Sequence, residues 1–147
     1  MTSAALDVSP PARWLWAVAG AGTLWNAYGV VQFANALGQT PESLMALGLS
    51  ESQAILYAGL PAWMSVVFGI GVLGGLAGSV ALGLGRRVAR PILATSLVAY
   101  VLLFAGDVAH GVFAAIPSQF AIITFVVAFA GALVWAAERA RRLGLLK

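Results

Sequence analysis

The sequence has no cysteine and very little charge. Of its 147 residues, 9% are charged and 61% are hydrophobic, whereas a soluble domain carries about 25% charged residues. The absence of cysteine excludes disulfides and thiolate metal sites. The low charge argues against a soluble fold, because a domain of this size could not bury so much apolar surface.

Several catalytic and cofactor-binding patterns are absent as well. The only lysine, Lys147, lies outside the long apolar runs, which excludes a retinal Schiff base. The only histidine, His110, is one ligand too few for haem held between two histidines. Motifs of zinc proteases and serine hydrolases do not occur. We therefore expect a protein that is not an enzyme and that uses no cofactor and no metal.

Four apolar runs are long enough to cross a membrane as helices. A hydrocarbon core of roughly 30 Å needs about 20 apolar residues, and each run is apolar on every face, which favours helices over barrel strands. We predict an all-α, polytopic membrane protein whose four transmembrane helices form an antiparallel bundle. The predicted spans are residues 14–37, 61–84, 92–115 and 119–137 of a single domain, 13–147, after a flexible cytoplasmic tail, 1–12.

The cations indicate the side of the membrane on which each loop lies. All eight flank the ends of apolar runs, and the other two loops contain none. Because cationic loops stay in the cytoplasm, both termini are predicted to be cytoplasmic. The arginines suit anionic lipid headgroups, so we expect the bilayer and no nucleic acid as their partner. The cations are Arg13, Arg86, Arg87, Arg90, Arg139, Arg141, Arg142 and Lys147.

The first outer loop carries two sets of helix-start signals. Thr40-Pro41-Glu42 supplies a cap, a first-turn proline and an acid at the positive end of a helix, and Gly48 supplies a stop. Ser50 and Gln53 have the spacing of a capping box. We predict two short helices here, lying on the outer membrane surface.

An acid and a histidine lie within the third run. Asp107 and His110 are three residues apart and share a helix face, on which Tyr100 also lies. An ionisable group inside a span costs about 2.5 to 3.5 kcal/mol on insertion scales and often marks a proton relay or a solute pathway. We interpret the two as a proton-titrating pair. The alternative is a structural role near the outer end of the helix.

A polar stripe lies on the outer half of the first run. Tyr28, Gln32 and Asn35 share one helical face, and Asn26 points elsewhere. Because a polar face is costly against lipid, the stripe should face protein, water or a ligand. Interhelical hydrogen bonds and a ligand-binding wall are both open. Together with Asp107, the stripe would line a vestibule open to the outside and covered by the two short helices.

The second run is rich in glycine. Gly71 with Gly75, and Gly74 with Gly78, are each four residues apart, a spacing that lets the backbone of a neighbouring helix come close. We call these four residues the glycine face and predict that it packs against another helix.

Short motifs spread over nearly the whole chain are Leu24-Trp25-Asn26 with Gly29, Pro61-Ala62-Trp63, Gly74-Gly75, Arg86-Arg87 before Pro91, and Gly144. They resemble those of a family of small bacterial four-helix inner-membrane proteins that is loosely labelled sugar-transporter-like. The resemblance implies a bacterial inner-membrane location and a transport role. It implies no particular binding residues.

Two functions are consistent with these features. The first is binding or transport of a small solute, with Asp107 and His110 as the titrating pair and Tyr28, Gln32 and Asn35 as the binding wall. The second is a noncatalytic structural or assembly subunit of a membrane complex, which docks a partner through the glycine face. Because four helices enclose little volume, we expect either one to work as a homo-oligomer or with a partner protein.

Overall fold

The computed structural model describes residues 12–147, and helices are the only regular secondary structure among them. The predicted tail, 1–12, lies outside the described residues apart from Ala12. Long and short helices follow one another along the chain. They are α1 (Arg13–Ala36), α2 (Pro41–Ala46), α3 (Glu51–Ala58), α4 (Ala62–Gly83), α5 (Ala89–Ala109), α6 (Val112–Ala115) and α7 (Pro117–Arg142).

Among the described residues, three helices are long and apolar enough to cross a membrane. They are α4, α5 and α7, and such helices are typical of a multi-pass membrane protein. The first of the four predicted spans is residues 14–37. The helix α1 covers this region with 24 residues, but it is not one of the three.

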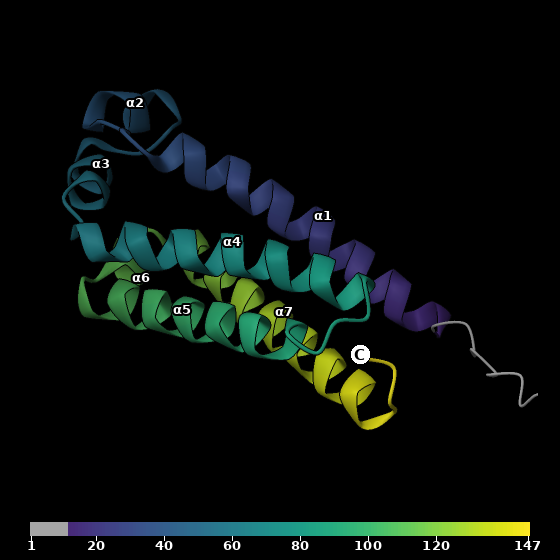
Figure 1. Cartoon of the computed structure of the whole chain (residues 1–147). Helices are drawn as coiled ribbons and strands as arrows, with labels where there is room; N and C mark the ends of the chain where they lie inside the picture. Colours follow the sequence, from purple (N-terminus) through teal and green to yellow (C-terminus); the bar gives the residue numbers. More distant parts are fainter. Residues whose placement is uncertain (1–11) are drawn as a thin grey trace, which may run out of the picture.

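The helix α4 lies at the centre of the arrangement. It packs against α1 on one side and α5 on the other, and α7 packs mainly against α5 (Figure 1). No Cα atom of α1 lies within 8 Å of one in α5. The helix α4 therefore separates the first long helix from the third.

Glycines on α4 allow both neighbours to come close. The amide of Asn26, on α1, occupies the space into which a side chain at Gly75 would project. The ring of Tyr100, on α5, lies 2.7 Å from the position of a Cβ atom at Gly71. The other two members of the glycine face are covered in the same way, Gly74 by Ser96 and Gly78 by Leu93. The glycine face is thus filled by helices of this chain.

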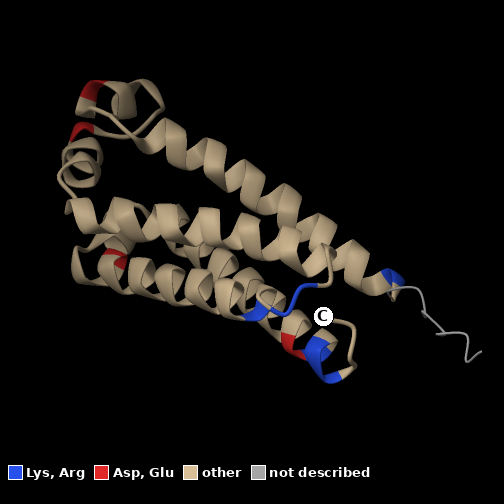
Figure 2. Ribbon diagram, in the orientation of Figure 1, with Lys and Arg blue, Asp and Glu red and all other residues tan. Residues whose placement is uncertain are grey.

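The two ends of the molecule differ in charge. Lys and Arg gather where α1 begins, α4 joins α5 and α7 ends, which we call the basic end (Figure 2). The opposite end holds α2, α3 and α6, and we call it the capped end. At the basic end, Glu138 of α7 lies 2.7 Å from Arg90 of α5 and also binds Arg141 and Arg142. This carboxylate links α5 to α7.

The two short helices α2 and α3 begin as predicted. Thr40 and Ser43 form a reciprocal capping box at the start of α2, and Ser50 and Gln53 form another at the start of α3. After α2, Gly48 has a φ angle of 99°, which glycine adopts without steric cost. Both predictions of a helix start are therefore confirmed.

The third predicted span, 92–115, is interrupted. The helix α5 ends at Ala109, and Gly111 has a left-handed conformation, with φ of 70°, before α6 begins. The prediction of one continuous helix is wrong here, because a left-handed glycine just past the last helical turn ends a helix. The chain is redirected, and α6 packs on α7. Asp107 consequently lies only two residues from the end of α5.

The close approach at Gly75 can be tested by adding one methyl group. Gly75→Ala places this group against the Asn26 amide, and overpacking typically costs about 1 to 3 kcal/mol. Gly131→Ala in α7 is the matched control, since nothing in the described part of the chain lies within 4 Å of its added Cβ atom. We expect Gly75→Ala alone to lower the thermal unfolding temperature of the purified protein in detergent. Equal temperatures for the two variants would contradict this packing.

Candidate functional site

Asp107 is the only acidic or basic residue that is buried within residues 12–147. Its exposed fraction is 2%, and its Oδ2 atom has no hydrogen-bond partner in the described part of the chain. A buried polar atom without a partner is costly, and a buried charge is more so. This oxygen would therefore be stabilised by a proton, or by a hydrogen bond from a donor group of a ligand.

His110 lies just beyond the last residue of α5, the helix that carries Asp107. It is the C-cap residue of α5, and its side chain is exposed. Its Nδ1 atom lies 2.9 Å from the carbonyl oxygen of Gly106. Because a carbonyl oxygen can only accept, Nδ1 carries the proton of this hydrogen bond. The two residues predicted as a pair thus occupy different environments, one buried and one exposed.

The helix α3 brings a tyrosine close enough to Asp107 for the two side chains to interact electrostatically. Burial raises the pKa of Tyr57, on α3, and the negative charge of Asp107 raises it further, whereas the side chain of Gln119 lowers it. Asp107, Tyr57 and Gln119 therefore meet at the capped end, although they come from α5, α3 and α7. From α3, Gln53 also donates from Nε2 to the carbonyl oxygen of Ala115 at 2.8 Å, which attaches α3 to α6.

The predicted binding wall lies elsewhere. Tyr28, Gln32 and Asn35, which we call the α1 stripe, are all exposed, with Tyr28 at 58%. They do not meet Asp107, because α4 lies between α1 and α5. The predicted vestibule between the first and third long helices is therefore not formed within one chain.

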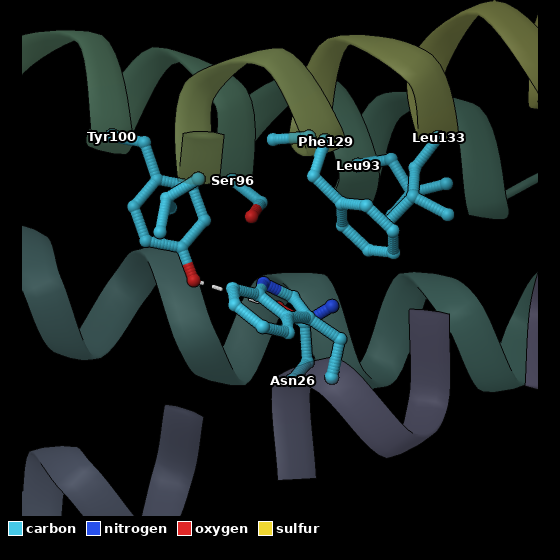
Figure 3. A pocket seen from close by; sticks show the side chains of 9 residues that line it. Asn26, Leu93, Ser96, Tyr100, Phe129 and Leu133 are labelled. Atoms are coloured by element: carbon cyan, nitrogen blue, oxygen red, sulfur yellow. Dashed lines mark hydrogen bonds between the residues drawn. The ribbon is translucent and has the colours of Figure 1, made fainter. Parts of the chain in front are cut away.

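The polar side chain that α1 turns inward is Asn26, which lies off the predicted stripe. Its exposed fraction is 2%, its Nδ2 atom donates to the Gly22 carbonyl oxygen at 2.8 Å, and its Oδ1 atom accepts from the hydroxyl of Tyr100 at 3.4 Å (Figure 3). Gly22, Asn26 and Gly29 follow a helical spacing that matches Gly71, Gly75 and Gly78 of α4. This shared spacing is the feature of the sequence that predicts which face of α1 packs against α4.

Tyr100 belongs to this inner cluster and lies away from the α1 stripe. Beside it, the hydroxyl of Ser96 donates to the carbonyl oxygen of Gly71 at 2.6 Å. Aromatic and aliphatic side chains fill the space around Asn26, Ser96 and Tyr100 (Figure 3) and leave no room for a water molecule. The cluster therefore joins α1, α4 and α5 and has no space for a solute.

Two buried side-chain oxygens in the described part of the chain lack a hydrogen-bond partner, Ser79 Oγ between α4 and α1 and Asp107 Oδ2 at the capped end, and only the second belongs to an ionisable group. No known protein family, curated protein or solved structure matches the chain. Its function is therefore inferred from Asp107 and from the surfaces of the molecule.

Proposed function

We propose that this chain is a bacterial inner-membrane protein in which α1, α4, α5 and α7 cross the bilayer as an antiparallel bundle. At 1.5 Å per residue, the 24 residues of α1 reach about 36 Å, which exceeds a hydrocarbon core of roughly 30 Å. The basic end and both termini lie in the cytoplasm, since cations resist translocation. The capped end faces outward, with α2 and α3 at the membrane surface.

This orientation can be tested with single cysteines, because the chain has none of its own. Leu47 and Val88 lie in loops at the capped and basic ends, and their side chains are 70% and 52% exposed. Leu47→Cys should react with a membrane-impermeant maleimide on intact cells, and Val88→Cys only after the membrane is permeabilised. Neither change alters the charge pattern. Reaction of Val88→Cys on intact cells would show that the basic end faces outward, which contradicts the proposed orientation.

Within this frame, the protein binds and transports a small solute together with a proton, and Asp107 is the group that holds the proton. The observation that supports this function is the buried Oδ2 atom without a partner. Intramembrane carboxyl groups of this kind are typical of proton relays and solute pathways. A transport role is also what the resemblance to the small inner-membrane family implies.

The surroundings of Asp107 suit exchange with the outer side. His110 is exposed just beyond the end of α5, where it can pass a proton between the outer solution and the carboxyl group. Asp107 is buried with Tyr57 of α3 in its vicinity, so a movement of α3 would give a solute access to it. The hydrogen bond between Gln53 and Ala115 opposes this movement.

The role of Asp107 can be tested with Asp107→Asn, which keeps the shape and removes the proton exchange. Purified protein is reconstituted in liposomes that hold a pH-sensitive dye, a potassium gradient with valinomycin drives proton entry, and a mixture of small sugars is supplied outside as the solute. Wild type should exceed empty liposomes, and Asp107→Asn should fall to their level. Glu51→Gln, an exposed acid at the same end, is the control and should match wild type.

A measurement of thermal stability separates an effect of Asp107→Asn on transport from an effect on folding. Asp107→Asn should unfold at the wild-type temperature or above it, because the variant no longer buries an ionisable group. Proton entry equal to wild type, at an unchanged unfolding temperature, would remove the transport function.

A second candidate function is supported by the exposed α1 stripe. Gln32 and Asn35 are polar and lie on a helix that we place in lipid, where such groups favour a protein neighbour. Because the glycine face is already filled within the chain, α1 is the better docking surface for a noncatalytic assembly subunit. Amides both donate and accept, so two copies in the same orientation can pair the same residues at the same depth.

This assembly function predicts an oligomer that depends on the α1 stripe. Each interhelical hydrogen bond contributes about 0.6 kcal/mol, so the double variant Gln32→Leu with Asn35→Leu should raise the dissociation constant several-fold. Light scattering after size exclusion in detergent measures the change. Val31→Leu, an exposed apolar position on the same helix, is the control. A monomeric wild type, or an oligomer unaffected by the double variant, would contradict the function.

A further inference from the structure

An apolar groove runs between α1 and α7 in the half of the molecule nearest the basic end. Its volume is about 200 Å³, and no polar surface contributes to its lining. Two alanines on α7 and one on α1 leave the space open between larger neighbours. The groove is lined by Val18, Ala21, Phe129, Ala132, Leu133, Trp135 and Ala136.

The cation Arg139 lies at the basic end of this groove. The guanidinium group of Arg139 is 5.4 Å from the ring centroid of Trp135, which lines the groove, and 5.9 Å from that of Trp14 on α1. Arg139 therefore bridges the two helices that form the groove. Both rings are attracted to the guanidinium group by their quadrupoles, which holds the charge in place.

Arg139 is distinct from its arginine neighbours. Glu138 binds Arg90, Arg141 and Arg142, whereas Arg139 takes part in none of the ion pairs found within residues 12–147. Its side chain is exposed. Its positive charge is therefore available to an anion that approaches along the groove.

We propose that the groove binds one anionic phospholipid, with an acyl chain between α1 and α7 and the phosphate group against Arg139. The apolar walls match the chain, and the cation at the end of the groove matches the headgroup. Basic pockets between membrane helices on the cytoplasmic side bind such headgroups. A helix of a second copy does not fit, because a helix is about 10 to 12 Å across with its side chains.

This inference rests on the proposed membrane insertion and is independent of the role of Asp107. The lipid also completes the structure, since α1 and α7 contact each other far less than α1 and α4 do. An acyl chain in the groove fills the gap between the two helices. Bound lipid would therefore stabilise the position of α1.

The site can be tested by native mass spectrometry of the full chain in detergent. Phosphatidylglycerol and phosphatidylcholine with identical acyl chains are titrated separately. Wild type should bind phosphatidylglycerol more tightly, and Arg139→Gln should weaken that binding about fivefold, the effect of one arginine near an anionic surface. Arg142→Gln removes an equal charge from the same helix and should have little effect.

Two further variants separate the headgroup from the acyl chain. Ala132→Phe fills the groove at an exposed position and should weaken binding of both lipids, whereas Arg139→Lys keeps the charge and should retain most of the preference. Asp107→Asn should bind phosphatidylglycerol as wild type does, so loss of proton transport and loss of this site are distinguishable.

Several results would overturn the lipid site. Equal affinity for the two lipids in wild type would show apolar binding without recognition of the headgroup. An equal loss in Arg139→Gln and Arg142→Gln would show general attraction to the basic end. Unchanged binding in Ala132→Phe would place the lipid outside the groove, and dimers that exclude lipid would place a second copy there.

Discussion

The contact between Asn26 and Gly75 fixes how α1 lies on α4, and the central packing depends on it. The amide fits only because α4 has no side chain at that position. Both polar atoms of the amide are satisfied, one by the backbone of Gly22 and one by the hydroxyl of Tyr100. A polar group at the centre of an apolar molecule thereby joins α1 to α5 across α4, and the opposite face of α1, with Tyr28, Gln32 and Asn35, is left exposed.

Local signals in the sequence are sufficient to predict where most of the helices lie. The apolar runs predict the positions of the long helices to within a few residues, except where Gly111 divides the third run. The capping residues Thr40 and Ser50 predict α2 and α3, because a cap depends on residues only three positions away. Lys and Arg also gather at a single end (Figure 2), since their positions follow directly from the order of helices and turns.

The site was harder to predict, because it is assembled from separate elements. The sequence singles out Asp107 as an ionisable group in an apolar run, but not its neighbours Tyr57 and Gln119, which come from α3 and α7. The separation of His110 from Asp107 depends on the turn at Gly111. The polarity of α1 alone points to Tyr28, Gln32 and Asn35 as its inward face. The rotation of α1 is instead set by the glycines of α4, because Gly75 leaves space for the Asn26 amide.

The hydrogen bond from Gln53 to Ala115 joins residues that are 62 positions apart in the chain. Proteins are made from the N-terminus onward, so α3 leaves the ribosome well before its acceptor exists. The segment that holds α2 and α3 must therefore remain undocked until α5 and α6 have been synthesised. Attachment of α3 to α6 is consequently a late event in biogenesis, and a nascent chain halted before residue 115 would lack the acceptor that fixes α3 at the capped end.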